Sequence, residues 1–289
     1  MFIPGHITGF FKIYKDKNIL KTGSTGAGIT LNKGVYTDVI DGKSDEFLRN
    51  SLLEIRDFDG EIYFNGDKIE LCSTIEVVKN YLNYNESDEF NYNIIHKSDF
   101  PLGCGLGTSG SCALGASYEL SKIYNINKVL EFAHTAEVKC GTGLGDVVAQ
   151  YTRGFVIRKK PGLPIDVKKI NIDDINNYYV VVEILGKKET GTIINNPEWI
   201  DKINKMSDEL LQKLLKSPTL ENFMSLSYKF AKDTGLASDE IIELCDDLSF
   251  TIGSSQAMLG NTVFCICEDK DLNDVLSILN KPIVCKIYQ

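Results

Sequence analysis

The sequence lacks the cysteine patterns that mark zinc sites and disulfide scaffolds. Its 8 cysteines include no Cys-x-x-Cys pair, which is the spacing expected of a structural zinc site. A chain of 289 residues is long enough to fold on its own core, and it shows no secretory leader. We therefore expect reduced thiols in a cytoplasmic protein rather than a disulfide framework.

Positive charge and long apolar runs are also scarce. Lys and Arg number 31 against 40 Asp and Glu, giving a formal net charge of −9. Binding to a nucleic-acid backbone depends on clustered Lys and Arg, so nucleic acid is not an expected partner. No run of about 18 uncharged apolar residues occurs, and a membrane-spanning helix is not predicted.

Apolar residues nevertheless make up 43% of the chain, and their order predicts an α+β protein with two domains. The break Pro161-Gly162-Leu163-Pro164 offers the best boundary, so we expect domains over 1–165 and 166–289. In the first, alternating apolar residues predict strands before residue 41 and a hairpin at 61–71 with Asn65-Gly66 in its turn. Helical spacing predicts helices at 72–84, 110–124 and 127–138.

The second half is expected to alternate helices and short apolar strands. Its predicted strands are YYVVVEIL, TVFCICE and PIVCKIY, which are rich in β-branched residues. Its predicted helices lie near 198–216, 219–234, 239–248 and 271–279.

The segment 101–118, PLGCGLGTSGSCALGASY, is dense in glycine and leads into a predicted helix. Glycines allow backbone N–H groups to face a ligand, and a helix start adds unpaired donors and a positive dipole end. Neither Gly-Lys-Ser/Thr nor a βαβ dinucleotide motif is present. We predict a phosphate site of another type, with Ser109 alternatively a helix N-cap. Its residues are Gly103, Gly105, Leu106, Gly107, Thr108, Ser109, Gly110 and Ser111.

Two carboxylates flank the next glycine-rich turn. His134 and Glu137 lie three positions apart on one predicted helix, and Asp146 follows nine residues after Glu137. Phosphoryl transfer uses a carboxylate on the metal and often a second near the nucleophilic hydroxyl. The alternatives are a solvated Glu137, an N-cap role for Asp146 and a core hydrogen bond for His134.

The glycine segment resembles the second motif of the GHMP kinases, Pro-x-x-x-Gly-Leu-Gly-Ser-Ser, with Thr108 replacing the first serine. The segments IPGHITGFF, TGSTGAGITLNKGV, AHTAEVKCGTGLGDVVAQ and SSQAMLGNTVF resemble in particular the archaeal pantoate kinases. Two departures from the wider superfamily are His6, where many relatives have Lys or Arg, and a shorter interval between Glu137 and Asp146. The resemblance implies the GHMP kinase fold: an N-terminal α/β sandwich with a left-handed βαβ unit and a C-terminal ferredoxin-like α+β domain.

The resemblance also implies a reaction, in which the γ-phosphate of ATP is transferred to the 4-hydroxyl of (R)-pantoate on the way to coenzyme A. It assigns catalysis to Asp146, Ser109 and Glu137, with Ser109 and Glu137 holding Mg²⁺. It assigns pantoate binding to three further residues. These are Ser24, His134 and Arg158.

Several alternatives stay open at this point. The alternatives to a pantoate kinase are another GHMP small-molecule kinase, of the homoserine, mevalonate or shikimate type, and a non-catalytic GHMP-like ligand sensor. Arg153 competes with Arg158 for the substrate carboxylate, and Arg158 is alternatively a surface charge in an RKK run. Residues 254–261 match the third GHMP motif or simply connect two elements. A homodimer is left open, and the adenine pocket is not identified.

Overall fold

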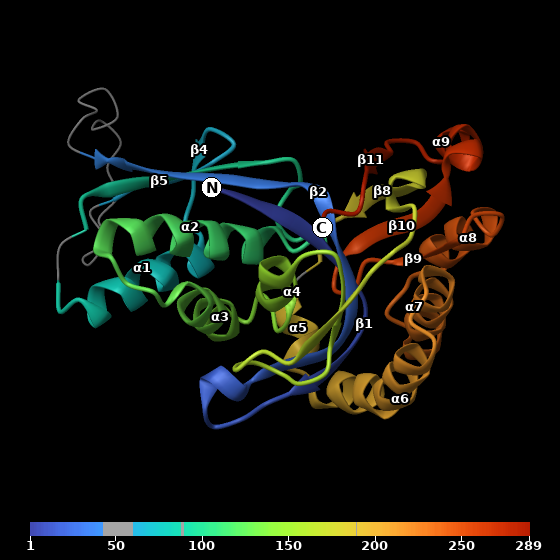
Figure 1. The fold of residues 1–289 in the computed structure, drawn as a ribbon, viewed down its shortest axis with the longest axis horizontal. Coiled ribbons are helices and arrows are strands. Elements are labelled where there is room, and N and C mark those ends of the chain that lie inside the picture. The colour runs from blue at the N-terminus through green and yellow to red at the C-terminus, as the bar shows by residue number, and fades with distance from the viewer. Residues whose placement is uncertain (43–59, 88–89, 189) are drawn as a thin grey trace.

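The computed structural model describes residues 1–42, 60–87, 90–188 and 190–289, and it confirms the α+β class. A seven-stranded sheet has the order β4-β3-β5-β2-β6-β7, with β1 paired to β2 (Figure 1). We call it the first sheet. Its strands are β1 (Phe2–Tyr14), β2 (Gly23–Asp41), β3 (Ile62–Phe64), β4 (Asp67–Lys68), β5 (Tyr92–Ser98), β6 (Phe155–Arg158) and β7 (Val167–Ile170).

Helices from the first half of the chain cover one face of this sheet. Close packing of α2 on β2 depends on Gly115, because a Cβ there would lie 2.4 Å from Oγ1 of Thr37. The parallel strands β3 and β5 are connected through α1 as a βαβ unit. The left-handedness of this connection stays a prediction. The helices are α1 (Cys72–Tyr84), α2 (Thr108–Tyr124), α3 (Val129–Cys140) and α4 (Asp146–Thr152).

The second sheet has four strands in the order β11-β8-β10-β9. Its elements follow the chain order strand, helices, two strands, helix, strand, which with this sheet order is the ferredoxin-like topology that we predicted. The strands are β8 (Tyr178–Gly186), β9 (Gly253–Gln256), β10 (Asn261–Glu268) and β11 (Ile283–Cys285). The helices are α5 (Thr190–Ile194), α6 (Pro197–Lys216), α7 (Leu220–Thr234), α8 (Asp239–Asp247) and α9 (Leu272–Ile278).

The three helices α6, α7 and α8 begin at side-chain caps. Asn196, Thr219 and Ser238 each accept a hydrogen bond from a backbone N–H in the first turn, which satisfies donors that the helix leaves unpaired. Within the part of the chain that the structure describes, no helix is both long and apolar enough to cross a membrane.

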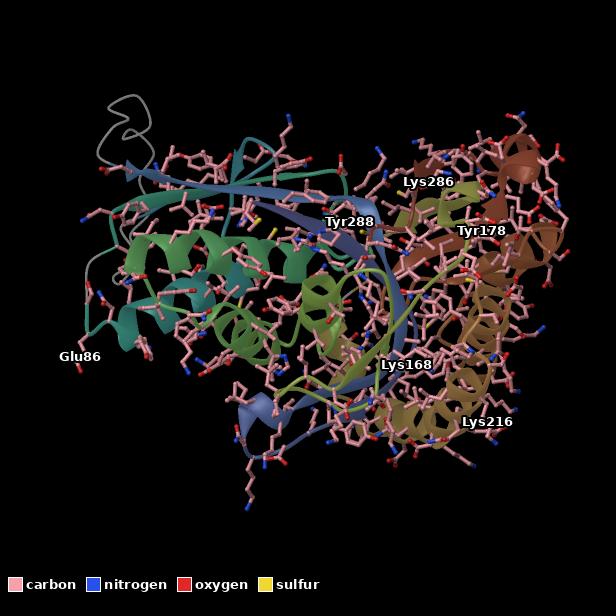
Figure 2. All side chains as sticks on the ribbon, in the orientation of Figure 1. Glu86, Lys168, Tyr178, Lys216, Lys286 and Tyr288 are labelled. Atoms are coloured by element: carbon pink, nitrogen blue, oxygen red, sulfur yellow. A yellow bond between two sulfur atoms is a disulfide. The ribbon has the colours of Figure 1, made fainter. Side chains whose placement is uncertain are left out.

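The two sheets are joined by shared packing. The long β1–β2 hairpin packs against α6 and α7, where the Ser207 hydroxyl donates to the Phe11 carbonyl at 2.5 Å. The C-terminal segment returns to the first sheet, where the Tyr288 N–H donates to the Thr30 carbonyl at 2.8 Å (Figure 2). β7 follows Pro164 yet pairs with β6 in the first sheet, and the domain division at 165/166 stays a prediction.

A disulfide joins Cys72 and Cys140, so the expectation of reduced thiols throughout is wrong for this pair. The cysteines are separated by 68 residues in sequence, but α1 and α3 pack together and bring the start of one helix to the end of the other. This proximity is a tertiary property that cysteine spacing does not reveal. The other six cysteines are buried and have no disulfide bond.

Candidate active site

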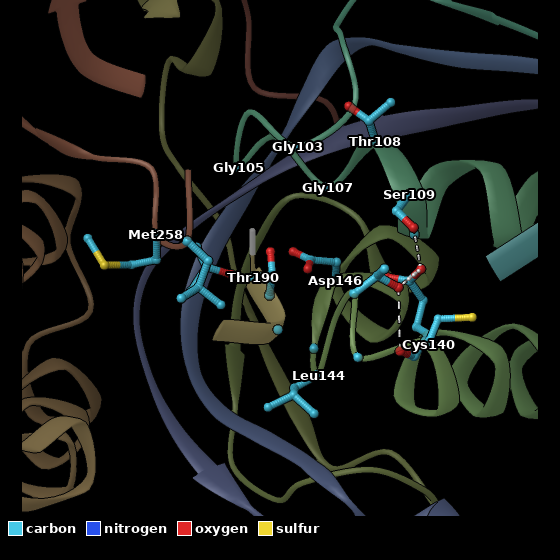
Figure 3. A pocket seen from close by; sticks show the side chains of 18 of the residues that line it. Gly103, Gly105, Gly107, Thr108, Ser109, Cys140, Leu144, Asp146, Thr190 and Met258 are labelled. Atoms are coloured by element: carbon cyan, nitrogen blue, oxygen red, sulfur yellow. Dashed lines mark hydrogen bonds between the residues drawn. The ribbon is translucent and has the colours of Figure 1, made fainter. Parts of the chain in front are cut away.

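The glycine loop between β5 and α2 forms one wall of a cavity of about 580 Å³ (Figure 3). Gly103, Gly105 and Gly107 have φ angles of 78°, 85° and 66°, a left-handed conformation that favours glycine. Gly105 also needs the space, because a Cβ there would lie 2.7 Å from Cα of Gly260. The cavity is therefore lined by bare backbone next to the start of α2, which suits an anion.

Most of the predicted phosphate-binding residues face this cavity. Leu106 and Ser111 do not line it: Leu106 is buried, and the Ser111 hydroxyl donates to the Pro4 and Gly107 carbonyls at 3.0 and 3.1 Å. The Thr108 hydroxyl donates to the Pro101 carbonyl at 3.1 Å and so fastens the loop. The predicted residues that line the cavity are Gly103, Gly105, Gly107, Thr108, Ser109 and Gly110.

Ser109 and Glu137 form a hydrogen-bonded pair at the cavity wall. The Ser109 hydroxyl donates to Oε1 of Glu137 at 2.6 Å, and the Thr142 hydroxyl donates to the same oxygen at 2.7 Å. Oε2 of Glu137 is buried and has no hydrogen-bond partner among the described residues. Burial raises the pKa of Glu137 to about 7, although the hydrogen bonds from Ser109 and Thr142 oppose the shift. The second oxygen therefore has neither the water nor the hydrogen-bond donor that a charged carboxylate requires.

Asp146 reaches the same cavity from the first turn of α4. Its Oδ1 lies 2.6 Å from Nδ1 of His6, a fully buried side chain on β1. Burial opposes ionisation, but the hydrogen bond from His6 and the nearby positive charge of Arg158 help to outweigh it, so the pKa of Asp146 lies below its ordinary value. The N-cap of α4 is Gly145 without a side-chain cap bond, so Asp146 does not cap the helix.

The turn between α3 and α4 brings the two carboxylates together. A Cβ on Gly143 would lie 2.4 Å from Oε2 of Glu137 and 3.2 Å from Oδ2 of Asp146. Only a residue without a side chain leaves these oxygens room to share one space. Figure 3 shows Asp146 near the middle of the cavity, with Ser109 on one side and Met258 on the other.

Arg158 enters the cavity from β6 and is 1% exposed. Its Nε and Nη1 have no hydrogen-bond partner among the described residues, and Nη2 lies 3.5 Å from the hydroxyl of Ser24. Burial lowers the pKa of Arg158 to about 10, against the opposing charge of Asp146. The guanidinium remains charged at neutral pH, so the cavity holds a buried cation with unused donors.

The structure separates His134 from the residues that line the cavity. Its Nε2 donates to the Thr22 carbonyl at 2.9 Å, and the side chain is buried on α3. His6, by contrast, was not among the predicted site residues, yet it contacts Asp146 directly. The available signal was its place in IPGHITGFF, where many GHMP kinases have a basic residue.

The segment that matches the third GHMP motif packs onto the glycine loop. Met258 and Leu259 line the cavity, and the Met258 N–H donates to the Thr8 carbonyl at 3.0 Å. A Cβ on Gly260 would lie 2.0 Å from the Cys104 carbonyl oxygen. The turn between β9 and β10 therefore closes one side of the cavity.

Comparisons with known proteins agree with this geometry. A family model described as the GHMP kinases N-terminal domain matches residues 71–154. The pantoate kinase of Methanocaldococcus jannaschii is 52% identical over 289 residues, which cover 100% of both chains. The pantoate kinase of Thermococcus kodakarensis is 32% identical, and the match covers 99% of this chain and 95% of that protein.

Solved structures show the same fold. A phosphotransferase related to the CoA biosynthesis pathway superposes with a TM-score of 0.83 at 29% identity, covering 99% of this chain and 95% of that one. The mevalonate kinase of Methanococcus jannaschii superposes with a TM-score of 0.70 at 16% identity, covering 100% and 98%. The predicted GHMP kinase fold is confirmed, and the chain belongs to the pantoate kinase family of the GHMP kinases.

Proposed function

We propose that this protein transfers the γ-phosphate of ATP to the 4-hydroxyl of (R)-pantoate, giving (R)-4-phosphopantoate and ADP. The observation that carries the proposal is the buried Arg158, whose unused donors face the same cavity as Asp146 and the glycine loop. A loop suited to phosphate, an acidic group and a buried cation thus share one space. Membership of the pantoate kinase family supports this acceptor.

Pantoate has a carboxylate, two hydroxyls and two methyl groups, and the cavity offers a group for each kind. A guanidinium binds a carboxylate through two parallel hydrogen bonds, which would satisfy the free donors of Arg158. The nearby Ser24 hydroxyl suits the 2-hydroxyl. Apolar side chains of the lining, Phe11, Leu144 and Met258, suit the two methyl groups.

Asp146 is the group that we propose for the reacting 4-hydroxyl. Its depressed pKa keeps it ionised at neutral pH, so it can accept the hydroxyl proton or orient that hydroxyl. The new bond forms between the 4-oxygen and the γ-phosphorus, and the bond to the β,γ-bridging oxygen breaks. Backbone N–H groups of the glycine loop would hold the phosphates in line for this displacement.

Ser109 and Glu137 fit a magnesium ion. Hydroxyl and carboxylate oxygens are ligands that Mg²⁺ accepts, and Oε2 of Glu137 is buried without a partner among the described residues. The described part of the chain contains no cluster of three or more His, Cys, Asp or Glu that could hold a metal, which fits an ion completed by phosphate and water. When bound, Mg²⁺ would neutralise charge on the phosphate oxygens.

The direct test is ADP release by the purified protein with four alcohols: (R)-pantoate, mevalonate, homoserine and shikimate. We expect turnover with pantoate alone, and phosphorus NMR of the product should place the phosphate on the 4-oxygen. Turnover with mevalonate but not pantoate would contradict the proposed acceptor. ATP binding without turnover of any alcohol would favour a ligand sensor.

We also propose a cytoplasmic location, because the phosphate donor ATP is supplied there, and assembly as a homodimer. Light scattering of the purified protein measures the assembly. A mass close to the 32.2 kDa of one chain would contradict the dimer.

A further inference from the structure

His6 occupies a fully buried position between the glycine loop and the proposed catalytic carboxylate. Its Nδ1 lies 2.6 Å from Oδ1 of Asp146. Asp146 lines the cavity with 26% of its side chain exposed, and its other oxygen, Oδ2, is not the one that His6 holds. One oxygen is thus held by the protein, while the other faces the space that the acceptor would occupy.

We propose that His6 is a positioning residue, which donates its Nδ1–H to Asp146 and thereby aims Oδ2 at the acceptor hydroxyl. The inference rests on the proposed phosphoryl transfer and adds a residue to it. His6 touches neither substrate in this scheme, and it acts only through Asp146.

The surroundings of His6 leave its ring little freedom. Its backbone N–H donates to the Leu106 carbonyl at 3.0 Å, which ties it to the glycine loop. Its Cβ lies 3.2 Å from where a Cβ on Gly107 would stand, and Nε2 lies 2.3 Å from the corresponding position on Gly28. The residue is therefore fixed to the loop and to β2 at once, so Asp146 is held in register with the proposed phosphate site.

Burial favours the neutral ring of His6, against the pull of the neighbouring carboxylate. Asp146 on α4 faces His6 and favours its protonation, while Arg158 on β6 opposes it, and Glu137 on α3 faces Asp146. Nε2 is buried without a partner among the described residues, so a proton there would add an unsatisfied buried donor. Burial is the largest influence and lowers the pKa of His6. The expected form is the neutral tautomer with its proton on Nδ1.

This arrangement gives a physical reason for histidine at position 6. A Lys or Arg there would place a second permanent cation beside the buried Arg158. A neutral imidazole supplies a donor to Asp146 without competing for the substrate carboxylate. Arg158 then supplies the cation that binds the substrate carboxylate, and its position determines which end of the cavity binds that anion.

The first test compares His6→Asn with His6→Leu, two side chains of similar size and branching. The amide nitrogen of Asn takes roughly the place of Nδ1 and can donate to Asp146, whereas Leu cannot. We expect kcat to fall about 100-fold in His6→Leu and less than about 10-fold in His6→Asn. KM for ATP and for pantoate should change less than about threefold in both, because neither substrate contacts His6.

The pH dependence of kcat gives a second measurement, which would not change if His6 only supported the fold. Without His6, the effect of burial on the pKa of Asp146 is opposed by Arg158 and a backbone hydrogen bond alone. The acid limb of kcat should therefore move to higher pH in His6→Leu and stay near the wild-type position in His6→Asn. Equal kcat in wild type and His6→Leu, or equal losses in both variants, would overturn the inference.

The second test needs no turnover and uses the wild-type protein. The chain has only 3 histidines, so ¹⁵N NMR of the labelled rings can be assigned with single variants. For His6 we expect a protonated Nδ1 and an unprotonated Nε2 at pH 7. The opposite tautomer, or a doubly protonated ring, would overturn the inference even if pantoate is phosphorylated, and the expected tautomer would support it even if another alcohol is the acceptor.

Discussion

Glu137 shows how a single residue of this site trades stability for function. The carboxyl is 2% exposed, and its second oxygen has no partner among the described residues. A buried carboxylate without enough partners is costly, which explains a pKa near 7. The oxygen without a partner is also free to bind the proposed magnesium ion.

The pH dependence follows from this shift. The pKa of Glu137 is about 7 in the folded protein against an ordinary value of 4.5. The folded state therefore binds an extra proton between these values, and stability falls as pH rises through them. Glu137→Gln should therefore raise the free energy of unfolding of metal-free protein by about 3 kcal/mol at pH 8 and by much less at pH 4.5. The same variant should lose turnover.

Urea denaturation with EDTA at the two pH values measures this difference. The exposed Glu243→Gln on α8 serves as the control and should give equal changes at both. If Glu137→Gln also gave equal changes, the carboxyl would not be held in its neutral form by burial.

Substrate recognition by Arg158 can be tested with the same substitution at Arg153 as the control. Arg158→Lys keeps the charge but loses the planar fork, so KM for pantoate should rise about 10- to 100-fold while KM for ATP changes less than about threefold. Arg153, the competing candidate, packs over the ring of Tyr288 at 5.3 Å and does not line the cavity. Steady-state kinetics of Arg153→Lys should match wild type, and the reverse pattern would assign the carboxylate to Arg153.

Motif positions near glycine turns predicted the cluster of Ser109, Glu137, Asp146 and Arg158, which the structure brings to one cavity. Their roles stay predictions. The substrate role of His134 also stays a prediction, but its position shows the limit of helical spacing as a guide. Residues three apart on a helix point about 60° apart, enough for Glu137 to face the cavity while His134 reaches the Thr22 carbonyl. Sequence spacing therefore predicts that two residues lie on the same side of a helix, but not that their side chains reach the same site.

At the scale of elements, local patterns predicted most helices and strands. The predicted helix at 72–84 is α1, and Asn65-Gly66 connects β3 and β4 as expected. These features depend on nearby residues, through apolar spacing and turn chemistry. The Cys72–Cys140 disulfide depends instead on the packing of α1 against α3, which no local pattern encodes.

The disulfide should be measurable as a contribution to stability. It closes a long loop across a separation of 68 residues, and removing such a link typically costs about 2–4 kcal/mol. The double variant Cys72→Ser with Cys140→Ser should lower the unfolding free energy by that amount. Thiol titration of denatured, unreduced wild type should find six of the eight cysteines reactive, and eight reactive thiols would contradict the bond.

The contact between the β9–β10 turn and the glycine loop is a second element-level test. Gly260→Ala would bring a Cβ to 2.0 Å from the Cys104 carbonyl oxygen, so the loop must shift. We expect KM for ATP to rise about 10-fold and stability to fall by about 1–3 kcal/mol. Gly186→Ala, whose Cβ would meet its nearest atom at 3.4 Å, should leave KM unchanged, and equal effects of the two would show that the contact does not shape the loop.

At the scale of the whole molecule, the cavity lies where the two halves of the chain meet. The glycine loop, Glu137, Asp146 and Arg158 come from the first half, and Lys188 with Met258 comes from the second. Packing of β1 on α6 and α7 keeps these parts together. Neither half alone encloses the cavity, so its place could be deduced from the sequence only through the family resemblance.

The most direct test of this account is a crystal structure with a non-hydrolysable ATP analogue, Mg²⁺ and (R)-pantoate. The account predicts the triphosphate on the backbone amides of the glycine loop, the metal on Ser109 and Glu137, and the pantoate carboxylate on Arg158. The 4-hydroxyl should lie within hydrogen-bond distance of Asp146. A triphosphate bound elsewhere, or a pantoate carboxylate away from Arg158, would contradict it.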